Sequence, residues 1–134
     1  FAFTGNKFEF RAVGSSANCA GPMTTLNTIM AETLKNFKIE VDGHIEKGEK
    51  KEVAIMQVIQ KYIVESKKVL FEGDGYSDEW EKEAKKRGLS NIKTTPLALD
   101  AYISDKVKKL FVDNNIYKLP ALEARHEIML EAYI

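Results

Sequence analysis

The sequence predicts a mainly helical protein, a bundle of about four to five helices preceded by one β-strand. From residue 22 onward, apolar residues recur at spacings of three and four, which is the period of amphipathic helices. Before that point, Phe8 and Phe10 alternate with charged residues, as in a strand with one buried face. Glycines and prolines between the apolar runs mark helix ends and starts. We therefore expect two units, over residues 1–21 and 22–134.

The predicted strand carries the most informative pattern in the chain. Lys7, Glu9 and Arg11 are spaced by two, so in a strand they share one face while the two aromatics share the other. A carboxylate between two cations suits a metal-bound polyphosphate, because the carboxylate holds the metal and the cations hold oxygens. The alternative is a charged strand face that is simply in water, which is the commoner arrangement on spacing alone.

The first two helices follow a loop of small residues. Pro22 suits a first helical position, and Gly43 is the expected stop. The apolar face between them comprises Leu26, Met30, Leu34, Phe37 and Val41. Residues 42–51 hold two glycines and many charges, so we expect a mobile connection there. The apolar stripe of the second helix comprises Val53, Met56, Ile59 and Ile63.

The C-terminal half predicts a loop and three further helices. Residues 71–76 form the loop, and Ser77 caps a short helix that ends at Gly88. Thr95 and Pro96 begin the next helix, whose apolar face comprises Leu99, Ile103, Val107 and Leu110. Pro120 opens the last helix, with Ala121, Ala124, Ile128 and Ala132 on one face.

Composition excludes several classes of function. Lys and Arg number 20 and Asp and Glu also number 20, so no net field favours nucleic acid or an anionic membrane. No apolar run approaches the roughly 20 residues that span a bilayer. The single cysteine, Cys19, excludes an internal disulfide and is expected to be a small buried group. His44 and His126 lack partners at zinc-ligand spacing. We expect a cytoplasmic protein.

Two blocks of the chain resemble one enzyme family. Residues 5–18, GNKFEFRAVGSSAN, are similar to the late active-site strand and following loop of glutamine synthetase, in the form of its type III class. Residues 71–77, FEGDGYS, with DEW at 78–80 and RGL at 87–89, resemble a segment of the helical C-terminal region of that class. The resemblance implies that residues 1–21 end a catalytic α+β domain and that residues 22–134 form the helical region.

The resemblance also implies a reaction and the residues that serve it. Glutamine synthetases join glutamate and ammonia at the expense of ATP, through γ-glutamyl phosphate. By position, Glu9 matches a ligand of Mg²⁺ or Mn²⁺, and Arg11 matches the catalytic arginine at the transferring phosphate. Lys7 falls where smaller classes use an arginine toward the nucleotide, so the charge is kept and the bidentate fork is lost. The loop departs as well, because Cys19 and Ala20 follow Asn18 where those classes continue Pro-Tyr.

The implied partners are glutamate, ammonia and ATP, in a ring-shaped homo-oligomer. One strand supplies too few groups to hold ATP and its metals, so we expect the chain to be a fragment that is inactive alone, possibly truncated at its C-terminal end. The alternative, from a different class, is a non-catalytic helical module for oligomerisation or interaction. Under that alternative, Lys7, Glu9 and Arg11 are ordinary surface charges.

Overall fold

The computed structural model describes residues 2–3, 5, 8–9 and 16–133. The predicted mainly helical class is confirmed. The helices are α1 (Ala20–Glu46), α2 (Lys51–Ser66), α3 (Asp78–Lys86), α4 (Thr95–Leu99), α5 (Asp105–Asp113) and α6 (Leu119–Tyr133), with short 3-10 helices η1 (Lys67–Val69) and η2 (Asp100–Ile103). Two short strands, β1 (Ala2–Phe3) and β2 (Phe8–Glu9), precede them. None of the described helices is long and apolar enough to cross a membrane.

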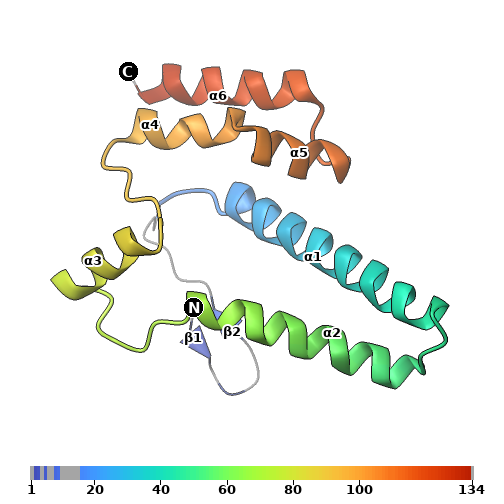
Figure 1. The fold of residues 1–134 in the computed structure, drawn as a ribbon. Helices are drawn as coiled ribbons and strands as arrows, with labels where there is room; N and C mark the ends of the chain where they lie inside the picture. Colours follow the sequence, from blue (N-terminus) through green and yellow to red (C-terminus); the bar gives the residue numbers. More distant parts are fainter. Residues whose placement is uncertain (1, 4, 6–7, 10–15, 134) are drawn as a thin grey trace.

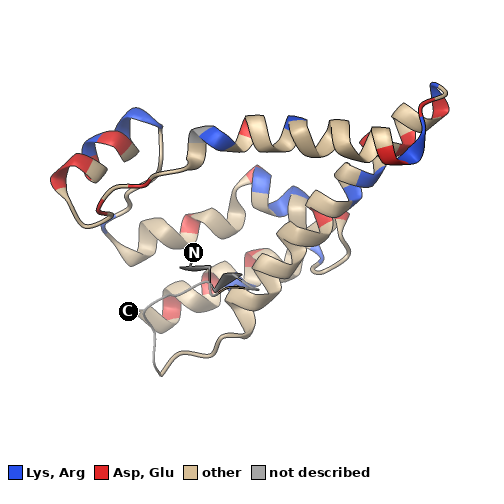
Figure 2. Ribbon diagram, turned by 90° about the horizontal axis from the view of Figure 1, so that it is seen from below, with Lys and Arg blue, Asp and Glu red and all other residues tan. Residues whose placement is uncertain are grey.

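The helices form two packed groups that share α1 (Figure 1). In one group α1 and α2 form an antiparallel hairpin, and in the other α6 lies along α4, η2 and α5. The first half of α1 contacts α5 and so joins the groups. Helix α3 lies apart from both (Figure 1). Lys, Arg, Asp and Glu are interspersed over the molecule, with dense groups on α3 and at the tip of the hairpin (Figure 2).

The core of the hairpin is small and lies near its tip. Val41 of α1 packs with Ala54 and Val58 of α2, and all three are buried. Phe37 and Tyr62 extend this core, with their rings edge to face and 5.8 Å between centroids. Small and medium-sized side chains thus form the centre of this core, and one aromatic ring from each helix covers it.

An ion pair with an added hydrogen bond reinforces the same contact. Lys61 Nζ donates to Glu40 Oε2 at 2.6 Å, and Tyr62 Oη donates to Glu40 Oε1 at 3.2 Å. The Lys61 hydrogen bond is the main reason why the pKa of the Glu40 carboxyl lies below its ordinary 4.5. The same bond raises the pKa of Lys61 above 10.5. Both oxygens of Glu40 thus tie α1 to α2.

The first helix runs further than predicted, which corrects the expected stop at Gly43. It continues to Glu46, and the reversal occurs at Gly48, whose φ of +94° lies in the left-handed region that glycine tolerates. The amides of Gly48 and Glu49 donate to the carbonyls of Ile45 and His44, at 2.9 and 3.2 Å. The connection to α2 therefore spans residues 47–50, and the expected longer connection over 42–51 is wrong.

The helix predicted from residue 95 through Leu110 is interrupted, which is why the described residues form six α-helices. Ser104 is extended, with ψ of 145°, and its hydroxyl donates to the carbonyl of Ala101 at 2.8 Å. A serine that bonds its own backbone in this way competes with helix propagation. Helix α5 restarts immediately with Asp105 in its first turn, where a carboxylate favours the positive helix end.

On two helices the apolar face that the sequence predicts to be buried is exposed. On α6 the expected face, which included Ile128, is exposed, while Leu122 and His126 are buried against α4 and η2. His126 Nε2 lies 3.3 Å from Asp100 Oδ1, so this buried ring has a polar partner on η2. On α2 the expected stripe is also exposed, and the core uses Ala54 and Val58 in its place.

Replacing Leu122 with alanine tests the corrected face of α6. Leu122 is fully buried, so its truncation should lower the free energy of unfolding by about 2–5 kcal/mol. Ile128→Ala on the exposed face is the matched control and should cost less than about 1 kcal/mol. Thermal and urea unfolding followed by circular dichroism measure both. Equal costs for the two variants would contradict the orientation of α6.

Removing the Glu40 carboxylate should destabilise the protein in a pH-dependent way. Because the folded-state pKa of Glu40 lies below its unfolded value, the stabilisation is present above pH 4.5 and is lost as the pH falls through the lowered folded pKa. Glu40→Gln should therefore lower the melting temperature at neutral pH and have little effect in strong acid. Glu46→Gln, at the exposed end of the same helix, is the control. A pH-independent loss for Glu40→Gln would contradict the assignment.

Candidate functional site

The residues predicted to bind ATP and metal lie mostly outside the described part of the chain. Lys7 and Arg11 fall outside it, and of Glu9 only the backbone is described. Glu9 belongs to β2, where it pairs with Ala2 of β1 in an antiparallel register, while Phe8 pairs with Phe3. The roles of Lys7, Glu9 and Arg11 therefore stay predictions.

The described residues do not form a metal centre by themselves. No group of three or more His, Cys, Asp or Glu side chains is placed to hold a metal within the part of the chain that the structure describes. Mg²⁺ takes six oxygen ligands, and usually some of them are waters. One carboxylate at Glu9 is a partial donor set, so a metal bound there would need protein ligands from outside the described residues.

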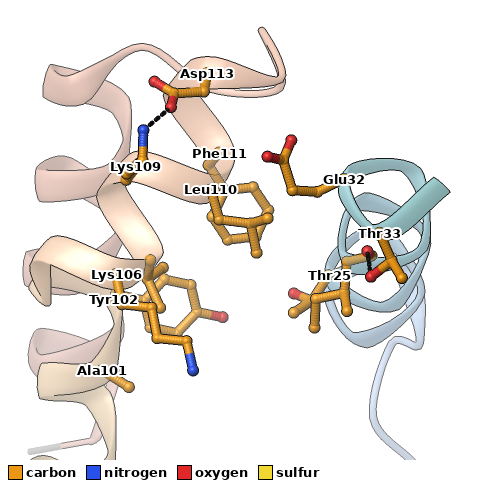
Figure 3. Close-up of a pocket in the computed structure, with 12 residues that line it drawn as sticks. Thr25, Glu32, Thr33, Ala101, Tyr102, Lys106, Lys109, Leu110, Phe111 and Asp113 are labelled. Atoms are coloured by element: carbon orange, nitrogen blue, oxygen red, sulfur yellow. Dashed lines mark hydrogen bonds and ion pairs between the residues drawn. The ribbon is translucent and has the colours of Figure 1, made fainter. Parts of the chain in front are cut away.

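A groove of about 620 Å³ runs between α1 and α5 (Figure 3). Leu110 and Phe111 of α5 point across it toward α1, which contributes Thr25 and Thr33 from the opposite wall (Figure 3). The other lining residues are Ile29, Glu32, Ala101, Tyr102, Lys106, Val107, Lys109 and Asp113. The walls are thus largely apolar, with charged groups around them.

Those charged groups are largely paired with neighbours. Asn114 Nδ2 donates to Glu32 Oε2 and to the carbonyl of Leu110, each at 2.9 Å, and so ties α1 to α5. The Asn114 hydrogen bond is the main reason why the pKa of Glu32 is lowered. Lys109 pairs with Asp113, and that bond raises the pKa of the lysine. The Glu32 and Asp113 carboxylates already accept hydrogen bonds from Asn114 and Lys109. The groove therefore suits packing or binding.

The second block of the resemblance forms a compact aromatic cluster. The rings of Phe71 and Trp80 lie 4.4 Å apart between centroids. The Arg87 guanidinium lies 6.0 Å from the first ring and 5.9 Å from the second. Arg87 also donates to the carbonyl of Leu70 at 2.9 Å and to Glu83 at 2.7 Å. These contacts attach α3 to the chain before it, and they explain why Phe71, Trp80 and Arg87 belong to one motif.

The loop within this motif is a structural turn, as predicted. Asp74 Oδ1 accepts a hydrogen bond from the amide of Tyr76 at 2.9 Å, and Ser77 Oγ donates to the carbonyl of Asp74 at 2.8 Å. Ser77 also caps α3, because its Oγ accepts from the amide of Trp80 at 3.2 Å. The side chain of Tyr76 is fully exposed. Phe71 and Trp80 thus pack against each other, whereas Tyr76, the third aromatic residue of this motif, does not join them.

The structure places three other residues that the sequence singled out. Cys19 is exposed at the start of α1, so the expectation of a buried thiol is wrong. His44 Nδ1 lies 3.2 Å from Glu49 Oε1, and His126 contacts Asp100. His44 thus contacts a carboxylate within the hairpin turn, and His126 contacts one within the group of C-terminal helices. The groove itself was missed, because its two walls come from segments about 80 residues apart and no local pattern joins them.

The architecture defines a helical domain with a largely apolar groove, and its described residues hold no cluster of side chains placed for a metal ion. The chain belongs to the glutamine synthetase C-terminal domain family, whose sequence model matches residues 54–134. It is 46% identical over 133 residues to a glutamine synthetase of Bacteroides fragilis (strain YCH46) and 45% identical over 133 residues to the type-3 glutamine synthetase of Dictyostelium discoideum. A glutamine synthetase of Butyrivibrio fibrisolvens is 34% identical. The resemblance seen in the sequence is confirmed.

These matches cover nearly all of this chain and a small part of each relative. Each alignment spans 99% of the chain, but only 18% of the Bacteroides and Dictyostelium proteins and 19% of the Butyrivibrio protein. The chain thus spans about a fifth of the length of the curated relatives it matches. No solved structure matches it.

Gly73→Ala should disrupt the aromatic cluster of the motif. A Cβ atom at residue 73 would lie 2.6 Å from the Phe71 ring, so the ring must leave its place beside Trp80. The loss should be about 0.5–1.5 kcal/mol, as for other aromatic pairs. Trp80 is the single tryptophan, so its fluorescence should shift to the red on exposure.

Gly75→Ala is the matched control, since nothing lies within 4 Å of a Cβ there. Its emission and its stability should stay close to those of the parent. If Gly73→Ala leaves the emission of Trp80 unchanged, Phe71 does not pack on that indole.

Proposed function

We propose that this chain is part of a type III glutamine synthetase, an ATP-dependent glutamate–ammonia ligase. The observation that carries the proposal is the extent of the likeness. The identity of 46% and 45% extends over 133 residues, whereas the C-terminal domain model matches only from residue 54. The N-terminal part with the NKFEFR run is therefore aligned as well, and not just the helices.

Within the proposal, residues 1–21 complete a catalytic domain and residues 22–134 form the helical region. In an extended strand, residues 7, 9 and 11 point to one side. Glu9 would then hold Mg²⁺ or Mn²⁺, Arg11 would bind the transferring phosphate and the substrate carboxylate, and Lys7 would contact the nucleotide. The bound metal would neutralise phosphate charge, and the cations would orient the oxygens.

The proposed substrates are ATP, glutamate and ammonia, which react through γ-glutamyl phosphate in a cytoplasmic, ring-shaped homo-oligomer. For this reaction the chain supplies one row of charged residues, Lys7, Glu9 and Arg11. A ligase of this kind needs several converging carboxylates and cations, so we propose that the isolated 134-residue chain is inactive. Turnover of ATP and glutamate by the purified chain would contradict this part of the proposal.

A second candidate function is a helical module for oligomerisation or interaction. The observation that favours it is the exposure of large apolar side chains along α1 and α2, including Met30, Leu34 and Met56. Met30 and Leu34 lie one turn apart on α1, and exposed apolar patches commonly mark interaction sites. The two functions are compatible, because the strand would serve the chemistry and the helices would serve assembly.

Glu9→Gln in the natural polypeptide that carries this chain separates the two functions. The substitution keeps the shape of the side chain and removes the charge that would bind the metal. We expect kcat to fall by about 100-fold or more, since removing even outer-sphere partners of a metal costs 10–100-fold. The Mg²⁺ or Mn²⁺ concentration for half-maximal activity should rise, and the size of the assembly should not change.

Glu131→Gln, at an exposed position of α6, is the control and should keep parental kinetics. If Glu9→Gln also retains full activity and the same metal dependence, Glu9 is an ordinary surface charge. The ligand role of this strand would then be wrong, whatever the assembly does.

A further inference from the structure

Helix α2 is apolar on two opposite faces. Its inner face, with Ala54 and Val58, packs on α1. At 3.6 residues per turn, a second group of apolar side chains lies on the other side of the helix. We call it the outer face of α2, and it comprises Val53, Met56, Ile59, Ile63 and Val64. The apolar face of a helix normally packs against another element.

The outer face of α2 has no cover in the described part of the chain. Its five side chains are between 36% and 68% exposed. Among the described elements, α2 contacts only α1 and η1. In Figure 1, α1 lies between α2 and the group formed by α4, α5 and α6, so these helices do not cover the outer face of α2.

The charges at the two ends of this face are complementary to each other. Glu52 lies one turn before Met56 and Lys67 lies one turn after Ile63, and both are exposed. Neither has an ion-pair partner among the described residues, in contrast to Lys61, which pairs with Glu40. A face with an acid at one end and a base at the other matches a reversed copy of itself.

We propose that the outer face of α2 pairs with the outer face of α2 in a second copy of the chain, with the two helices antiparallel about a two-fold axis. The axis passes between residues 59 and 60. Met56 then lies opposite Ile63 of the partner subunit, and Glu52 lies opposite Lys67 of the partner subunit. Each contact occurs twice, as in any isologous interface.

The antiparallel direction follows from the charges. A parallel pair would bring Glu52 beside Glu52 of the partner subunit and Lys67 beside Lys67 of the partner subunit, and like charges at close range repel. The spacing of residues 52, 56, 59 and 63 by three and four is also that of a helix–helix seam, in which side chains of one helix fill holes on the other.

The pair is small. Helix α2 has 16 residues and is about 24 Å long at 1.5 Å per residue. One such seam buries less than the ~800 Å² per partner of a standard interface. We therefore place it as one contact within a larger assembly. It does not depend on the ligase activity, so it would survive the failure of that proposal.

Disulfide trapping in the natural polypeptide tests the pairing. In a Cys19→Ser background, Gln60→Cys places a thiol beside the two-fold axis, within reach of its own copy. Lys51→Cys is the matched control: it is exposed on the same helix, but antiparallel pairing separates it from its copy by about 25 Å of helix rise. A disulfide needs Cα atoms within about 7 Å.

Mild oxidation should link the Gln60→Cys subunits into covalent dimers on a non-reducing gel at least 10-fold faster than the Lys51→Cys subunits. Equal rates for the two variants would overturn the proposal. So would a Gln60→Cys thiol that resists labelling without forming dimers, because another part of the polypeptide or a different protein would then cover the face.

Charge exchange gives a second measurement, for which circular dichroism verifies that the helices are intact. Glu52→Lys alone and Lys67→Glu alone should each slow the trapping of the Gln60→Cys dimer several-fold, since each creates two repulsive contacts. The double variant restores opposite charges across the axis and should recover most of the parental rate. A double variant that is as slow as the single variants would overturn the assigned register.

Discussion

The contact between α1 and α2 is the constraint on which the rest of the structure depends. In this contact Val41 packs with Ala54 and Val58, and the Glu40 carboxylate of α1 accepts hydrogen bonds from Lys61 and Tyr62 of α2. The reversal at Gly48 makes this contact possible. Helix α1 has 27 residues and is about 40 Å long, far more than its contact with α2 requires. Its first half is therefore free to contact α5, and one helix holds both groups in place.

The groove between α1 and α5 and the exposed face of α2 follow from that arrangement. The hydrogen bond between Asn114 and Glu32 joins α1 to α5 at the edge of the groove, which Leu110 and Phe111 line. Helix α3 is attached differently, through Phe71, Trp80 and Arg87, and it contacts no other helix of the described chain. The helical region thus presents several surfaces and concentrates little of its apolar area in one core.

Among the described residues, most ion pairs join neighbours on the same helix, and Lys61–Glu40 and Lys108–Glu123 join different helices. Such pairs are worth little in water and mainly set the orientation of side chains. The chemistry of the proposed ligase rests on the row Lys7, Glu9 and Arg11, which was found by resemblance. The groove between α1 and α5 was found only by geometry, since its walls come from distant segments. The apolar stripe of α2 is visible in the sequence, and the structure shows that it is exposed.

The sequence by itself determined the helical class, the loop over 71–76, the cap at Ser77 and the stop at Gly88, because these depend on residues within one or two turns. It also determined the family, through two local motifs. Only the tertiary structure decided which face of each helix is buried. Helices α2 and α6 carry apolar residues on more than one side, so Leu122 and Ile128 are equivalent in pattern. The partner helix selects between them, since α4 and η2 lie beside Leu122 and leave Ile128 exposed. Likewise Gly43 and Gly48 are both possible stops, and the chain reverses at the one that brings Val41 against α2.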